Sequence, residues 1–251
     1  MSNSSTVYFC SDVHLGIDTE QPSHIREQAL INWLNTIKAD ASHIYIVGDL
    51  FDYWYEYKSV VPKGYFELFA TMKSIVDSGI SITYLKGNHD LWHYGYLTDQ
   101  LGITIATGPI ISDLNGHKFY ITHGDGIGKG DIGYKIIKSI LRNRFCQQLF
   151  GAIHPTLGLP LMRYMSKRSR VSHKHVANPT AHHHQYCQDT LLQQPDIDYF
   201  IMGHIHHKEI TDIGQAKYIN LGDWTSAYSY AKWDGEQMEL LRWNINSYMN
   251  D

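Results

Sequence analysis

Residues 43–52 read HIYIVGDLFD, an apolar run that is followed at once by a glycine and two aspartates. A short apolar run rich in β-branched and aromatic residues indicates a buried β-strand. Asp49 and Asp52 therefore stand where that strand ends. Because ligands of open α/β sheets bind at the carboxyl ends of the strands, this segment predicts a sheet with a functional rim.

Four further predicted strands also end in polar residues. These endings are Asp12-Val13-His14, Gly87-Asn88-His89-Asp90, His123-Gly124-Asp125 and Gly203-His204-Ile205-His206. We expect these side chains to meet on one rim, with the adjacent glycines letting the backbone turn closely. Carboxylate, carboxamide and imidazole groups suit Mn²⁺, Fe or Zn²⁺, and the lack of cysteine argues against a thiolate zinc site. A bridging carboxylate such as Asp49 can hold two metals about 3.5–4 Å apart for phosphoryl displacement.

The rest of the chain alternates strands and helices at first and then forms hairpins. Strands are predicted at 7–13, 43–47, 80–85, 103–106, 110–114, 118–122, 199–202, 208–213, 217–221, 227–233 and 239–243, and helices at 25–38 and 65–76. Asn115-Gly116 and Asp234-Gly235 mark tight turns. This order predicts an α/β fold, an α+β sandwich of two packed mixed β-sheets with helices outside.

Residues 132–188 differ in composition from the rest of the chain. They contain no Asp or Glu, and their basic residues are Lys135, Lys138, Arg142, Arg144, Arg163, Lys167, Arg168, Arg170 and Lys174. The segment carries +9 and the remainder −13, which together give the net charge of −4. Its periodicity is helical over 134–150 and again from an Asn178 cap with Pro179 as the first helical residue. We predict a helical insert at 132–188 on a core formed by 1–131 and 189–251.

The ordered pattern D-x-H, G-D-x-x-D, G-N-H-D, H-G-D and G-H-x-H resembles the calcineurin-like metallophosphoesterase superfamily over residues 12–206. The resemblance implies a two-metal phosphoesterase with a sandwich fold, whose nucleophile is a hydroxide shared by the metals. It assigns Asp12, His14, Asp49 and His206 to the first metal. It assigns Asp49, Asn88, His123 and His204 to the second metal.

The resemblance also assigns two residues to acid–base chemistry. His89 matches the family histidine near the leaving-group oxygen, and Asp52 matches the carboxylate that orients it. Such a pair fits general acid catalysis near neutral pH. Tyr53-Trp54 stand where protein Ser/Thr phosphatases have an arginine, which argues against that class. Two alternatives stay open, namely a dimetal nuclease or broad-specificity phosphodiesterase with a basic insert, and a scaffold that binds no metal.

The position of the insert between His123 and His204 is similar to that in the UDP-2,3-diacylglucosamine hydrolase family, which belongs to the lipid A pathway. The resemblance implies hydrolysis of the pyrophosphate of UDP-2,3-diacylglucosamine to UMP and 2,3-diacylglucosamine 1-phosphate. We expect two divalent ions, Mn²⁺ first, with Fe or Zn²⁺ as alternatives. The candidate substrate-binding residues are Asp131, Lys167, Arg168, Arg170 and Lys174, and those for acyl chains are Leu149, Phe150, Leu157, Leu159, Leu161 and Met162.

One residue departs from that family's pattern. Its better-known members have arginine where this chain has His89, which leaves the exact substrate open, because an arginine fork and an imidazole grip a pyrophosphate differently. The basic insert also has a simpler interpretation, as helices packed for stability with a solvated charged face. Nine cations without a balancing anion favour an anionic partner instead.

Composition narrows the location of the protein. Hydrophobic residues make up 43% and charged residues 18%, as in globular domains. Three cysteines without a CxxC pair indicate free thiols in a reducing compartment. The lack of a signal-peptide pattern, and of any apolar run of ~18 residues, predicts a cytoplasmic protein. The basic and apolar insert suits peripheral docking on the anionic inner face of the cell membrane, whereas nucleic acid is not an expected partner. The oligomeric state stays open.

Histidines and aromatic residues outside the pattern have weaker interpretations. His182-His183-His184 cannot chelate one ion well, because successive helical residues point about 100° apart, so we expect exposed side chains. Trp54, Trp92 and Tyr94 follow the metal motifs closely. They could line the pocket, stack on uracil or belong to the core.

Overall fold

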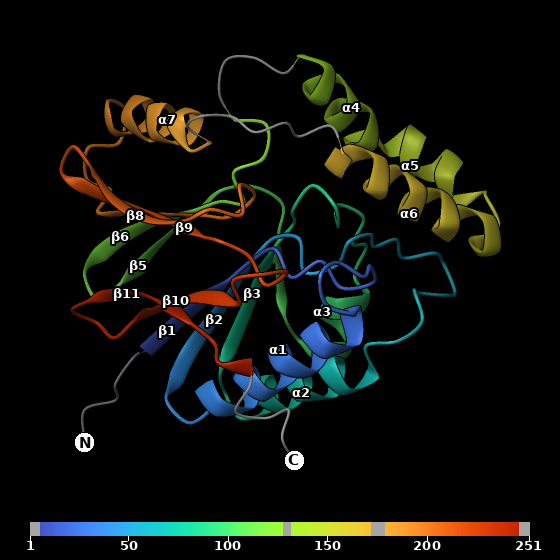
Figure 1. Ribbon diagram of the computed structural model, residues 1–251, viewed down its shortest axis with the longest axis horizontal. Coiled ribbons are helices and arrows are strands. Elements are labelled where there is room, and N and C mark those ends of the chain that lie inside the picture. The colour runs from blue at the N-terminus through green and yellow to red at the C-terminus, as the bar shows by residue number, and fades with distance from the viewer. Residues whose placement is uncertain (1–5, 128–131, 172–178, 246–251) are drawn as a thin grey trace.

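The computed structural model describes residues 6–127, 132–171 and 179–245, which form two stacked β-sheets (Figure 1). The first sheet has the order β11 (Met238–Arg242), β10 (Ser229–Trp233), β1 (Thr6–Cys10), β2 (Ala41–Val47), β3 (Ser81–Leu85) and β4 (Thr104–Ala106). The second has the order β5 (Ile110–Leu114), β6 (His117–Ile121), β7 (Tyr199–Met202), β9 (Ala216–Leu221) and β8 (Lys208–Ile213). Each sheet mixes parallel and antiparallel pairs. The predicted sandwich is confirmed, and every predicted strand is present with ends within three residues.

Alternate residues of the central strands face opposite sides of the first sheet. In β1, Val7 and Phe9 join the cluster between the two sheets, whereas Tyr8 and Cys10 join the cluster beneath the helices. Phe9 stacks on Phe119 of β6 with ring centroids 6.0 Å apart, which connects the sheets. Burial of both faces explains why these strands appear in the sequence as continuous apolar runs.

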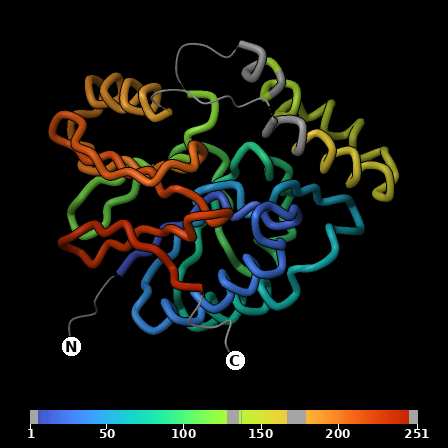
Figure 2. Tube along the Cα trace, in the orientation of Figure 1, coloured from blue at the N-terminus to red at the C-terminus, as the bar shows by residue number. Residues whose placement is uncertain are grey.

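Helices cover the outer face of each sheet (Figures 1 and 2). The first sheet is covered by α1 (Ser23–Ile37), α2 (Phe66–Asp77) and α3 (Tyr96–Leu101), and the second by α7 (Ala181–Leu191). The six-residue helix α3 was not predicted, because it is too short for a helical period to show in the sequence. Among the described helices, none has both the length and the apolar character that a bilayer crossing needs.

Three helices of the insert stand above the loops at the carboxyl ends of the first sheet (Figure 1). We call α4 (Ile132–Arg142), α5 (Arg144–Gly151) and α6 (Pro155–Val171) the lid. Asn143 separates α4 from α5, since its side chain accepts the amides of Phe145 and Cys146. Pro155 opens α6, a position where its missing N–H removes no helical hydrogen bond.

Direct hydrogen bonds hold the lid against the core. Trp92 Nε1 donates to the carbonyl of Leu141 at 2.7 Å, and the Tyr55 hydroxyl donates to the carbonyl of Gln147 at 2.8 Å. Trp92 is 7% exposed, so it serves as core beneath the lid.

Helix α7 packs on the second sheet, although the predicted insert 132–188 includes its first residues. Cys187 lies in a buried cluster with Tyr120, Phe200 and Tyr218 of that sheet. The predicted start of the helix at Pro179 is wrong, because Pro179 lies in a turn and the helix begins at Ala181. Asn178 lies outside the described residues.

The prediction that the three consecutive histidines are exposed is wrong for His183. It lies one helical turn before Cys187 on the face that meets the sheet, and it is 3% exposed. Its Nδ1 is 2.9 Å from the Tyr218 hydroxyl, and its Nε2 is 3.1 Å from the carbonyl of Gly124. Burial lowers the pKa of His183 to about 3. His184 is half-buried beside Glu209, and His182 is exposed.

We predict that His183 makes folding stability depend on pH below neutrality. The folded ring stays neutral down to a pKa of about 3, whereas an unfolded histidine takes up a proton near pH 6.5. Between these two pKa values the unfolded state binds more protons than the folded state. The free energy of unfolding therefore decreases as the pH is lowered, by up to ~1.4 kcal/mol per pH unit. In urea unfolding from pH 7 to 5, His183→Gln should show a shallower loss than wild type. The exposed His182→Gln should keep the wild-type slope, and equal slopes in all three chains would contradict the prediction.

Candidate metal centre

The chain reverses sharply just beyond the strands that carry the predicted ligands. Five of these ligands have left-handed backbone with φ between 50° and 69°, namely Asp12, His14, Asp49, His204 and His206. Residues other than glycine rarely adopt this conformation, which costs on the order of 1–3 kcal/mol and persists only where the surroundings fix it. The reversal turns side chains from different loops towards one point.

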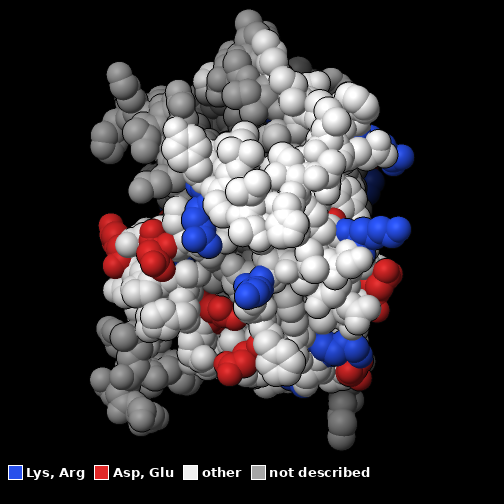
Figure 3. All heavy atoms as spheres, turned by 90° about the vertical axis from the view of Figure 1, so that its right-hand side faces the viewer, with Lys and Arg blue, Asp and Glu red and all other residues white. Residues whose placement is uncertain are grey.

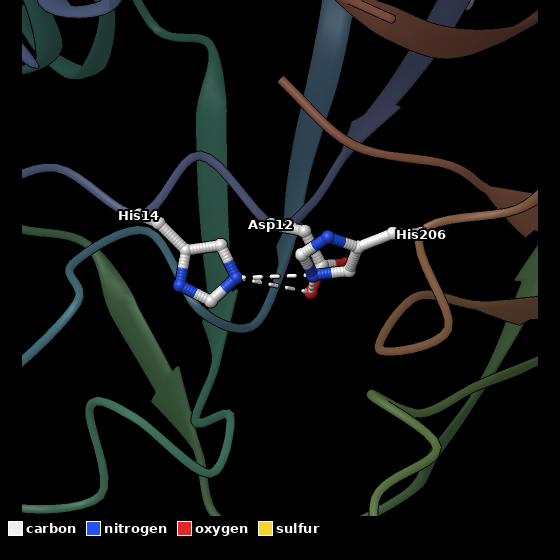
Figure 4. A group of neighbouring side chains, drawn as sticks. All are labelled: Asp12, His14 and His206. Carbon is white, nitrogen blue, oxygen red and sulfur yellow. Dashed lines mark hydrogen bonds and ion pairs between the residues drawn. The ribbon is translucent and has the colours of Figure 1, made fainter. Parts of the chain in front are cut away.

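The first group of converging side chains is Asp12, His14 and His206 (Figure 4). His206 Nε2 lies 3.2 Å from Asp12 Oδ1 and 3.1 Å from His14 Nε2. Asp12 is fully buried, and its Oδ2 accepts the amide of His204 at 2.9 Å. Its Oδ1 accepts no hydrogen bond among the described residues. A divalent cation would satisfy a buried carboxylate oxygen that faces two ring nitrogens.

The second group is Asp49, His123 and His204, with Asn88 beside it. His123 Nε2 lies 3.3 Å from Asp49 Oδ2 and 3.1 Å from Asn88 Oδ1. His123 Nδ1 donates to the carbonyl of Val47 at 2.8 Å. This bond fixes the ring and turns Nε2 towards the group, as in many metal-binding histidines.

Asp49 lies between the two groups. Its Oδ2 is 3.9 Å from His14 Nε2 in the first group and 3.3 Å from His123 Nε2 in the second. Its Oδ1 accepts the amide of His89 at 2.8 Å. The His89 ring could also join His14 and Asp49 around an ion. All seven predicted ligands are thus brought together, with Asp49 between the two groups.

The buried carboxylates and the histidines of this centre stabilise each other's charged forms. Burial would raise the pKa of Asp12, but His206 and His14 outweigh it and hold that pKa well below its usual range. Burial likewise opposes ionisation of Asp49, yet His123 lowers its pKa. Asp49 in turn raises the pKa of His123 well above its usual range in spite of burial. The two buried carboxylates are therefore held in their ionised form.

Asp90 supports the centre from below, a role that the sequence pattern did not reveal. Its buried carboxylate accepts the amides of Asp49 at 3.3 Å, Phe51 at 3.2 Å and Gly87 at 2.9 Å, and the Tyr84 hydroxyl as well. The loops after β2 and β3 are thereby tied to each other. No sequence signal separates such a supporting carboxylate from a ligand, because both stand in the same motif.

Two glycines are required by the closeness of these loops, as the sequence predicted. A Cβ atom at Gly87 would lie 2.1 Å from Asp49 Oδ1, and one at Gly203 would lie 2.5 Å from Asp12 Oδ2. Any larger residue would displace a carboxylate of the centre.

His89 and Asp52 meet beside the first group, and a residue of the lid joins them. His89 Nδ1 lies 3.5 Å from Asp52 Oδ1 and 3.1 Å from the Asp52 carbonyl. The Ser166 hydroxyl of α6 donates to Asp52 Oδ2 at 2.6 Å and is 3.1 Å from His89 Nδ1. Ser166 is 8% exposed. Sequence reasoning missed it, since nothing marks a serine 77 positions away from His89 as its neighbour.

The remaining predicted site residues are the candidate substrate-binding residues, which lie in or next to the insert. Lys167, Arg168 and Arg170 belong to α6, directly after Ser166. Asp131 and Lys174 lie outside the described residues. Lys138 of α4 pairs with Asp125 of the H-G-D motif at 2.5 Å, a second contact between lid and rim.

The aromatic candidates have different environments. Trp54 is fully buried and stacks on Phe51 with ring centroids 4.4 Å apart, so it belongs to the core with Trp92. Tyr94 is 52% exposed and lines a cavity instead.

Comparisons with known proteins match nearly the whole chain. The family model described as Calcineurin-like phosphoesterase matches residues 5–208. A UDP-2,3-diacylglucosamine hydrolase from Porphyromonas gingivalis is 33% identical over 94% of this chain and 97% of its own length. One from Aeromonas salmonicida is 28% identical over 86% of this chain and 85% of its own length. A solved phosphoesterase structure from E. coli aligns over 95% of this chain and 93% of its own with a TM-score of 0.49 and 14% identity.

We predict that Asp49→Asn greatly lowers the amount of bound metal, because the amide removes a negative charge that both groups share. After incubation with Mn²⁺ and desalting, atomic emission should find about two ions per wild-type chain and fewer than one in Asp49→Asn. Asp212→Asn, a change of an exposed aspartate on β8, should retain the wild-type content. Circular dichroism would check that each variant is folded. Wild-type metal content in a folded Asp49→Asn would show that Asp49 does not bridge.

Proposed function

We propose that this chain, which belongs to the calcineurin-like phosphoesterase family, hydrolyses the pyrophosphate of UDP-2,3-diacylglucosamine to UMP and 2,3-diacylglucosamine 1-phosphate. As a family member it is a hydrolase that acts on phosphate or pyrophosphate bonds. The names of the relatives supply the substrate. The observation that carries the proposal is the contact of the lid with the candidate centre, where Ser166 reaches Asp52 and His89.

Two divalent cations are part of the proposal. Asp12, His14, Asp49 and His206 would hold one, and Asp49, Asn88, His123 and His204 would hold the other. Mn²⁺ is our first choice, with Fe or Zn²⁺ as alternatives, since this ligand set accepts several first-row ions. When bound, the ions would neutralise the phosphate oxygens and activate a water molecule.

His89 would act on the leaving group. Its Nδ1 faces Asp52 and Ser166, which leaves Nε2 as the ring atom to meet the substrate. Burial lowers the pKa of His89 to about 4, so the ring does not carry a charge at neutral pH by itself. The negative charge of a bound pyrophosphate would favour protonation of the ring, and His89 could then donate that proton to the leaving oxygen.

The lid would bind the lipid part of the substrate. Leu149, Leu157 and Leu161 are 56%, 68% and 42% exposed, which is unusual for leucines on one unit. Phe150, another predicted acyl contact, packs on Tyr55 and Trp92 and supports the lid instead. Exposed apolar side chains beside the basic residues of 132–188 suit acyl chains and the anionic inner face of a membrane. The protein would therefore work in the cytoplasm, peripherally at the membrane.

The proposed reaction predicts a clear substrate preference. With Mn²⁺, the purified chain should release UMP from UDP-2,3-diacylglucosamine with a kcat/KM at least a hundredfold above that for bis-p-nitrophenyl phosphate. EDTA should abolish both activities, because both need the same centre. Release of UMP would be followed by liquid chromatography. Good cleavage of the diester together with an intact lipid substrate would replace the proposal with a broad-specificity phosphodiesterase.

The roles of His89 and Ser166 predict losses of turnover without loss of metal. His89→Ala should lower kcat by about a hundredfold, the usual range for a general acid. Ser166→Ala should lower kcat by about tenfold, since it removes one hydrogen bond that orients the ring. Ser166→Thr keeps the hydroxyl and should recover most of the turnover. Tyr164→Phe removes an exposed hydroxyl from the same helix and serves as the control.

Metal content decides how these variants are interpreted. Both should bind as much Mn²⁺ as wild type, because neither residue is among the seven proposed ligands. Loss of metal from His89→Ala would instead make His89 a ligand, as its distance to His14 and Asp49 allows.

A further inference from the structure

A second cavity lies apart from the candidate metal centre. It has a volume of about 1050 Å³ and lies where the α4–α5 corner of the lid meets segments 55–61 and 91–100. No proposed metal ligand lines it, and neither do Asp52, His89 or Ser166. Its size is that of a site for a small organic ligand.

The inner wall contains a buried imidazole, that of His93, beside the carboxylate of Glu56. His93 is 5% exposed, and neither of its ring nitrogens has a hydrogen-bond partner among the described residues. Its Nδ1 lies 3.5 Å from Glu56 Oε1. The ring stacks on Trp54 with centroids 5.8 Å apart and contacts Tyr84 edge-on at 5.0 Å, so it cannot turn away. Bound water or an ion can satisfy a buried polar atom of this kind.

Glu56 is already satisfied by the protein. Its Oε1 accepts Trp54 Nε1 at 3.1 Å, and its Oε2 accepts the amides of Tyr94 and Tyr96. This carboxylate is 7% exposed and fixes the loop that carries the aromatic residues of the cavity. It is therefore a structural part of the wall, and its negative charge also favours the charged form of the nearby Lys86.

Four cations line the same cavity. Lys86 is half-buried at the inner wall, and its ammonium donates to the carbonyl of His93 at 3.1 Å. Arg142 ends α4, Arg144 begins α5, and Lys58 lies across from them. Burial lowers the pKa of Lys86 and the charge of Arg142 adds to this effect, whereas the charges of Glu56 and Asp90 oppose it. No ion pair of these four is found among the described residues. The lining also contains the carboxylates of Glu56 and Asp99, which the four cations outnumber, so a bound anion would pair with the excess positive charge.

The cavity also offers flat aromatic surface beyond its cations. Tyr94 is 52% exposed and lies beside Tyr55, with ring centroids 5.7 Å apart. Figure 3 shows the face at the right of Figure 1, where basic and acidic side chains are scattered over a largely uncharged surface. An inorganic phosphate would leave most of this volume empty. A ligand with a phosphate and a planar ring matches both parts of the lining.

We propose that this cavity is a nucleoside monophosphate site, in which Lys86, Arg142 and Arg144 bind the phosphate and Tyr94 contacts the base. UMP is the probe of choice because the proposed reaction would release it, and this choice rests on the proposed function. Lys86 and His93 flank Asn88 and His89 on the same loop. A bound nucleotide would therefore contact the loop that supplies residues to the metal centre.

Calorimetric titration of the full chain, with EDTA present, tests the proposal. UMP should bind at least tenfold more tightly than either uridine or inorganic phosphate. The double variant R142Q/R144Q should bind UMP at least tenfold more weakly, and both positions are exposed, so the fold should be kept. Lys73→Gln, a change of an exposed lysine on α2, should bind as wild type does. Asp49→Asn should also retain the affinity for UMP, since the metal centre is elsewhere.

Several outcomes would overturn the proposal. Loss of UMP binding in Asp49→Asn but not in R142Q/R144Q would place the nucleotide in the metal centre. Equal affinity for UMP and inorganic phosphate would reduce the cavity to a general anion site, and absence of UMP binding would remove the site altogether. These titrations contain no lipid substrate and no turnover, so a failure of the proposed hydrolysis would leave their results unchanged.

Discussion

The pairing of β1 with β2 continues past the last residues of both strands, and the arrangement of the metal centre depends on it. The amide of Asp12 donates to the carbonyl of Gly48 at 3.1 Å, and that of His14 donates to the carbonyl of Asp49 at 3.0 Å. These bonds hold left-handed residues that would relax if the loops were free. Asp90 adds the loop after β3 to the same assembly. The strain is sustained because the sheet beneath is buried on both faces, which makes its strand ends rigid.

Electrostatics explain why so many histidines gather at this place. Asp12 and Asp49 are 0% and 1% exposed, and buried carboxylates are costly unless positive charge compensates them. Imidazoles can provide that compensation by binding protons, and they can also share the site with metal ions. The chain outside residues 132–188 carries a net charge of −13, whereas residues 132–188 carry +9. Contacts such as Lys138 with Asp125 bring the two parts together at the rim.

The sequence predicted the sheets from local apolar runs, and the resemblance of the ordered motifs supplied the seven candidate ligands that the fold brings together. Apolar runs that end in Gly-Asp or Gly-His reveal a strand and its functional end together. Contacts that cross the fold leave no such pattern, and for that reason Ser166 and the supporting role of Asp90 were missed. The burial of His183 follows from the packing of α7 on the second sheet, a contact that three consecutive histidines do not reveal. The helix α3, between Gly95 and Gly102, was too short to be recognised.

Under the proposed function, the hydroxyl of Ser166 would let the lid influence which substrates are turned over, and not only which are bound. Under the proposed function, a phosphate ester that does not engage the lid could still reach the metals, but it would meet a proton donor whose ring is less firmly held. Selection would then be expressed in the rate of the chemical step. A cell contains many nucleotide diphosphates with similar head groups. If turnover depends on Ser166, a buried side chain of α6, these compounds would escape wasteful cleavage.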